Sequence, residues 1–84
     1  MDTLSDKAIA VFAFAAYHQL STGTRISRVV RTDHQGHEAD PDAVTELTKK
    51  GLAAVDGDYI AFTSDGEAML ERAIAGLRNA IGAA

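Results

Sequence analysis

Residues 47–70 read LTKKGLAAVDGDYIAFTSDGEAML, and this stretch decides the fold. Two short apolar runs, LAAV and YIAFT, flank Asp56-Gly57-Asp58, which carries the Asp-Gly signal of a tight β-hairpin. Ser64-x-x-Glu67 follows at once and has the spacing of a capping box, a pattern that starts helices. We therefore predict a hairpin over 52–63 that runs directly into a helix over 65–81.

The first helix is predicted over residues 4–20, with a capping signal near Ser5. The run AIAVFAFAAY at 8–17 is apolar on nearly every side, which indicates a helix covered from several directions. This run is about half the length of a membrane span. We therefore expect a buried helix and no membrane association.

Two shorter helices are predicted between this one and the hairpin. Over 24–31, Ile26-x-x-Val29-Val30 has the spacing of one helical face, and arginines recur every third residue on the other side. Over 41–50, Asp40-Pro41 supplies an N-cap and a first-turn proline. The predicted order is helix, helix, helix, hairpin, helix, a mainly α fold with a small antiparallel hairpin, in the α+β class.

Composition places the chain among ordinary globular domains. It has 84 residues, of which 46% are hydrophobic and 24% charged, so we expect one domain over 1–84. The sequence has no cysteine and no basic signal-peptide start, which fits a cytoplasmic protein. No phosphate-binding loop, nucleophile elbow or similar motif occurs. We therefore expect no enzyme activity, no cofactor and no metal.

Four segments resemble the winged helix-turn-helix proteins, in particular MarR-like and related bacterial transcriptional regulators. They are Ile26-x-x-Val29-Val30, Val44-x-x-Leu47, Lys49-Lys50-Gly51-Leu52 and Phe62-Thr63-Ser64-Asp65-Gly66-Glu67. The resemblance covers residues 24–70. It implies a winged-helix domain in which the helix over 41–50 is the recognition-type helix and the hairpin over 52–63 is the wing.

In that family the third helix enters the major groove of double-stranded DNA, and the second helix positions it. The resemblance therefore implies a small DNA-binding transcriptional regulator. Cations neutralise phosphates, and hydroxyl groups can reach base edges, so these side chains on the two short helices are the candidate contacts. The predicted DNA-binding residues are Arg25, Arg28, Arg31, Thr45, Thr48, Lys49 and Lys50.

Acidic residues favour an alternative function, protein binding without DNA binding. The net charge is −4, the predicted wing tip has no cation, and Asp42 and Glu46 are expected on the outward face of the recognition-type helix. DNA binding requires the five cations of the predicted set to form one continuous face, and the alternative does not. A third hypothesis, a metal-responsive regulator, rests on His34-x-x-His37 in a polar loop.

The last helix carries large apolar residues at 4, 3, 4 spacing, which is typical of a helix-pairing seam. The stripe either packs on the first helix or forms a dimer interface. Together the two helices offer more apolar surface than one small domain readily covers, so we expect a homodimer built from them. The predicted interface residues are Leu70, Ile74, Leu77 and Ile81.

Overall fold

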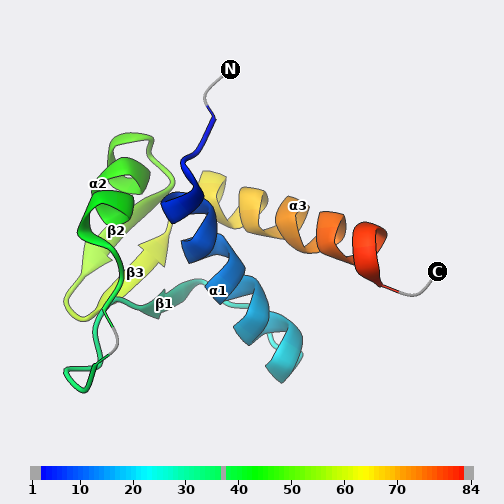
Figure 1. Cartoon of the computed structure of the whole chain (residues 1–84), viewed down its shortest axis with the longest axis horizontal. Helices are drawn as coiled ribbons and strands as arrows, with labels where there is room; N and C mark the ends of the chain where they lie inside the picture. The colour runs from blue at the N-terminus through cyan, green and yellow to red at the C-terminus, as the bar shows by residue number, and fades with distance from the viewer. Residues whose placement is uncertain (1–2, 37, 83–84) are drawn as a thin grey trace.

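The computed structural model describes residues 3–36 and 38–82, which form three helices and a three-stranded antiparallel sheet. The predicted α+β class is confirmed. In Figure 1, α2 lies above the hairpin of β2 and β3, and α3 projects away from the sheet. The elements in chain order are α1 (Asp6–Thr22), β1 (Arg28–Val30), α2 (Pro41–Lys49), β2 (Ala53–Asp56), β3 (Tyr59–Phe62) and α3 (Ser64–Ile81).

Ser5 and Asp40 cap α1 and α2 as the capping signals indicate, but α1 begins at Asp6 and ends at Thr22, two residues later at each end than predicted. The Ser5 hydroxyl accepts a hydrogen bond from the backbone N–H of Ala8, and the Asp40 carboxylate accepts from the first turn of α2. The cap of α3 differs from the prediction, because Thr63 and not Ser64 holds that position. The Thr63 hydroxyl accepts from the Gly66 N–H and donates to the Gly51 carbonyl, so it ties the helix to the hairpin.

The helix predicted over 24–31 is wrong, because part of this segment is the strand β1. β1 pairs antiparallel with β3, with Val29 opposite Ile60, and the sheet order is β1-β3-β2. Strand alternation turns Val29 into the core and leaves Arg28 exposed. The cluster of β-branched residues favours a strand, and pairing with β3 satisfies the backbone groups that a helix would have satisfied internally.

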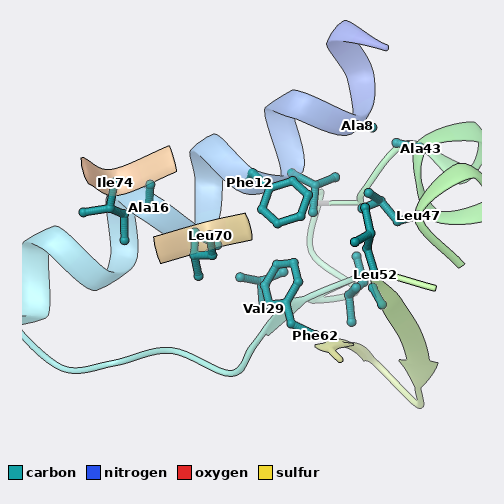
Figure 2. Packing of buried hydrophobic residues seen from close by; sticks show 14 residues of the cluster. Ala8, Phe12, Ala16, Val29, Ala43, Leu47, Leu52, Phe62, Leu70 and Ile74 are labelled. Atoms are coloured by element: carbon teal, nitrogen blue, oxygen red, sulfur yellow. The ribbon is translucent and has the colours of Figure 1, made fainter. Parts of the chain in front are cut away.

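The core lies where α1, the sheet and α3 meet. The Phe12 and Phe62 rings stack with centroids 5.2 Å apart, and Figure 2 shows Leu70 of α3 beside them. Leu47 of α2 and Ile60 of β3 are fully buried in the same cluster. This single core holds all three helices against one face of the sheet.

The start of α3 sits directly on the backbone of residue 52. A Cβ atom at Gly66 would overlap the Leu52 carbonyl oxygen and lie 3.3 Å from the Cβ of Phe62. The same carbonyl accepts a hydrogen bond from the Thr63 N–H at 3.0 Å. Only glycine permits this approach, so Gly66 fixes the angle at which α3 leaves the hairpin.

Within the described part of the chain, no helix combines the length and the apolar content needed to cross a bilayer.

Candidate functional site

The predicted DNA-binding residues lie in separate places, and Arg25 contacts α3. Its guanidinium group faces α3, with Nη2 3.9 Å from Glu67 Oε1 and Nε 3.7 Å from Glu71 Oε1. These two carboxylates neutralise the cation locally. Arg25 therefore belongs to a surface ion-pair cluster that joins the α1–β1 loop to α3.

Arg28 lies on the exposed face of the sheet. Its guanidinium carbon is 4.3 Å from the centre of the Tyr59 ring, a cation–π geometry between β1 and β3. Val29, the next residue, points to the opposite face and is buried. Arg28 is thus held by the sheet and not by a helix next to α2.

Arg31 and His34 hold the tip of the hairpin that was predicted to be a wing. Arg31 Nε donates to the Gly57 carbonyl at 3.1 Å, and the Arg31 N–H donates to the Asp58 carbonyl at 2.6 Å. His34 Nε2 lies 3.1 Å from Asp58 Oδ1. The tip is therefore attached to the segment that follows β1 and is not a free arm.

Glu46 does not lie on the outward face of α2, contrary to the prediction. Its carboxylate accepts hydrogen bonds from the Ser5 hydroxyl at 2.6 Å and from the Ser5 N–H at 2.9 Å. The hydroxyl bond, then the N–H bond, lower the pKa of Glu46, and the nearby Lys50 ammonium adds to this effect. Lys50 also donates to the Thr3 carbonyl at 3.3 Å. We call the contacts of Glu46 with Ser5 and of Lys50 with Thr3 the N-terminal clasp. Lys50 is therefore engaged in an intramolecular contact.

The outward face of α2 carries Asp42, Thr45, Thr48 and Lys49, all exposed. The Thr48 hydroxyl donates to the Val44 carbonyl in the preceding turn. Thr45 and Arg31 line one shared hollow between α2 and the strands. Of the predicted DNA-binding residues, the structure therefore places Arg31 beside Thr45 on the exposed side of α2.

The five predicted cations do not form one continuous face. Arg25 is paired on α3, Arg28 is stacked on the sheet, and Lys50 is held in the clasp. The reason is the missing second helix, because the three arginines share a face only in a helical conformation. In and around a strand they point to different neighbours.

A second surface is apolar and lies on α1 and α3. Seven large hydrophobic side chains among the described residues are exposed, and five of them are on these two helices. Two adjoining hollows run between the helices and meet at Leu77. Figure 1 shows α1 and α3 diverging toward their C-terminal ends. We call it the α1–α3 face; the exposed large residues that line its hollows are Ile9, Leu20, Leu77 and Ile81.

The predicted dimer interface divides between the core and this face. Leu70 and Ile74 are each 1% exposed and fill the core, so a second copy cannot reach them in this structure. Leu77 and Ile81 are 38% and 81% exposed and belong to the α1–α3 face. The first two residues are packed in the core, and the last two line the hollows between α1 and α3.

The sequence-based list omitted the α1 members of this face. Ile9 and Leu20 lie on a helix that is apolar on nearly every side, and this pattern was the available signal. Periodicity alone does not identify which side of such a helix stays exposed. The packing of α1 on both the sheet and α3 determines which side of α1 stays exposed.

The metal-responsive hypothesis gains no support from the arrangement. In the parts of the chain that the structure describes, no three side chains of metal-binding type come together. His34 is engaged with Asp58, and His37 lies outside the described residues.

The comparisons with known proteins find no match: no family model fits the chain, and no curated protein or solved structure is significantly similar to it.

Proposed function

We propose that this chain is a winged-helix-type interaction module that binds protein through the α1–α3 face and forms a homodimer there. The single observation that carries the proposal is the concentration of exposed large hydrophobic side chains on two neighbouring helices. Contiguous apolar surface of this kind on a small domain is typical of protein contacts. The order helix, strand, helix, hairpin, helix and the sheet order β1-β3-β2 support the winged-helix comparison, with a loop in place of the second helix.

The surface area of the chain supports self-association. Its accessible surface is 5528 Å², whereas a compact monomer of 8.9 kDa is expected to expose about 4800 Å². The projecting C-terminal half of α3 contributes to the excess. Each partner in a standard interface buries about 800 Å², so the excess is of the size that one interface removes from water.

The charge distribution of the face also favours a second copy. The chain has 12 acidic residues and a net charge of −4, yet none of the acids lies between residues 7 and 32 or after residue 71. Most of α1 and the projecting half of α3 therefore carry no carboxylate. Two copies can meet there without repulsion between carboxylates, and Arg78 is the one charged residue among those that line the two hollows.

Sedimentation equilibrium across a wide concentration range tests the proposal, with Ile81→Glu as the disruptive variant. Ile81 is 81% exposed, so the substitution leaves the monomer fold intact but places a charge in the interface. Each dimer contains the change twice, and burying an isoleucine contributes about 1.5–3 kcal/mol, so we expect the dissociation constant to rise about 100-fold or more. Ala75→Glu, on the exposed side of the same helix, is the matched control.

Two results would contradict the proposal. One is a natural protein that stays monomeric at every concentration reached. The other is equal weakening of the dimer by Ala75→Glu and Ile81→Glu, which would indicate a general charge effect and not the α1–α3 face.

DNA binding is the second candidate, favoured by the withdrawal of Glu46 into the N-terminal clasp. Without that carboxylate, the outward side of α2 offers Thr45, Thr48 and Lys49 beside the remaining acid Asp42. Thr45 shares a hollow with Arg31 and Glu38. Fluorescence anisotropy with a mixed-sequence duplex at rising salt tests this function. A double Arg31→Ala/Lys49→Ala variant should flatten the salt slope by about two units, and Arg25→Ala should leave it unchanged. No binding at low salt would exclude this candidate.

A further inference from the structure

A hollow of about 410 Å³ lies on the side of α1 that is away from the α1–α3 face. The last turns of α1, the loop that follows, β1 and Tyr59 of β3 form its walls. Its floor is aliphatic, with contributions from Ile26, Val29 and Val30. The volume falls within the range of about 300–1,000 Å³ that is usual for small-molecule sites.

Arg28 is the cation that lines this hollow, and it stacks on Tyr59. Its guanidinium group rests 4.3 Å above the centre of the Tyr59 ring. Among the described residues, no ion pair includes Arg28, although acids outnumber bases in the chain by 12 to 8. Stacking on an aromatic ring orients a guanidinium and leaves its N–H groups available to an acid.

His18 adds a second polar group to the rim. Its ring packs edge-on against Phe14, with centroids 4.5 Å apart, and against Tyr17 at 5.4 Å. The imidazole is thereby held at the mouth of the hollow, where one of its ring nitrogens can hydrogen-bond a ligand.

We propose that this hollow binds an aliphatic monocarboxylate of medium chain length. The carboxylate pairs with Arg28, and the hydrocarbon body lies on the part-exposed side chains of Ile26 and Val30. A second, almost wholly apolar hollow adjoins at Val29 and Val30 and continues toward Ala10 and Ile60. The two hollows together give a hydrocarbon chain a longer path than the first alone, so length as well as charge governs recognition.

This site is independent of the proposed dimer. Ile9 and Leu20 line the hollows on the α3 side of α1, whereas His18 lines the hollow on the β1 side. A monomeric protein that binds the carboxylate would contradict the proposed function alone. A dimer that does not bind it would contradict this inference alone.

Titration of the ¹⁵N-labelled full chain with octanoate, followed by NMR chemical shifts, tests the inference. We expect saturable shifts of the Ile26 and Arg28–Val30 amides. A hydrogen-bonded charge pair discriminates strongly, so 1-octanol should bind at least about tenfold more weakly than octanoate. Acetate, which has the acid but no hydrocarbon body, should also bind at least about tenfold more weakly.

Variants locate the carboxylate. Arg28→Gln should weaken octanoate binding at least about tenfold, and Arg78→Gln on α3 should leave it unchanged. Thermal unfolding monitored by circular dichroism checks that both variants fold. The inference is overturned if octanol or acetate binds as tightly as octanoate, if no saturable shifts occur, or if folded Arg28→Gln binds octanoate as the natural protein does.

Discussion

Replacing Gly66 by alanine should destabilise the protein more than any other single-methyl addition to α3. The new Cβ would overlap the Leu52 carbonyl oxygen and lie 3.0 Å from its carbonyl carbon. Both are backbone atoms, so the first turn of α3 must move away. Overpacking of this kind costs about 1–3 kcal/mol. Lengthening the hydrogen bond from the Thr63 N–H to the same carbonyl costs about 1 kcal/mol more.

These costs are large for a domain of this size. A chain of 84 residues is expected to have a free energy of unfolding of about 4–13 kcal/mol. A loss of about 2–4 kcal/mol should lower the midpoint of thermal unfolding by roughly 10–30 °C. Urea and thermal unfolding, followed by far-UV circular dichroism, would measure this loss of stability. The protein concentration should be one at which the association state is known.

Gly76→Ala is the matched control, since it adds the same methyl group to the same helix. No atom lies within 4 Å of the position of its Cβ. Helix propensity then favours alanine by about 0.5–1 kcal/mol, so this variant should be more stable than the natural protein. The packing argument is refuted if Gly66→Ala is as stable as the natural protein.

Three further outcomes are expected. The pKa of Glu46 lies below its ordinary value of 4.5. Its contribution is therefore present above pH 4.5 and is lost as the pH falls, so unfolding curves of the natural protein and Glu46→Gln should converge in acid; a constant difference would contradict this. Thr63→Ala should cost about 0.5–2 kcal/mol in urea unfolding, whereas Ser64→Ala should change stability little. Leu47→Ala should cost about 2–5 kcal/mol, and a smaller loss would mean that the core collapses around the cavity.

Local chemistry made the hairpin and the helix starts predictable. Asp56-Gly57-Asp58 specifies a tight turn, and Gly57 indeed has a positive φ of 59°. Asp40-Pro41 marks the start of α2 for reasons contained within one turn of helix. The capping of α3 was misplaced by one residue, because two neighbouring hydroxyl residues offer the same chemistry.

The strand β1 was not predictable from local pattern alone. Ile26-x-x-Val29-Val30 fits one side of a helix, and with only three paired residues the strand shows little alternation. Pairing of Val29 with Ile60, far along the chain, decides between the two conformations. The positions of the three arginines, and with them most of the predicted DNA site, depended on that non-local choice.

The division of the predicted dimer interface between core and surface also depends on contacts between distant elements. Leu70, Ile74, Leu77 and Ile81 form one stripe by sequence spacing, and spacing cannot show where α1 leaves α3. Likewise, helical periodicity placed Glu46 outward, whereas a hydrogen bond to a residue 41 positions away turns it toward α1. Side chains that depend on contacts between distant elements are the ones that the sequence misplaced.

The N-terminal clasp makes α1 a shared support for two surfaces. Ser5 and Glu46 join the start of α1 to α2, while the next turn of α1 contributes Ile9 to the α1–α3 face. If a partner on the α1–α3 face shifts α1, it changes the free energy of the clasp and so the affinity of α2 for a ligand. By linkage, that ligand then changes the affinity for the partner by the same factor. Hydrogen exchange of the Ser5 amide, measured in the monomer and in the dimer, would give the size of this coupling; equal rates would mean there is none.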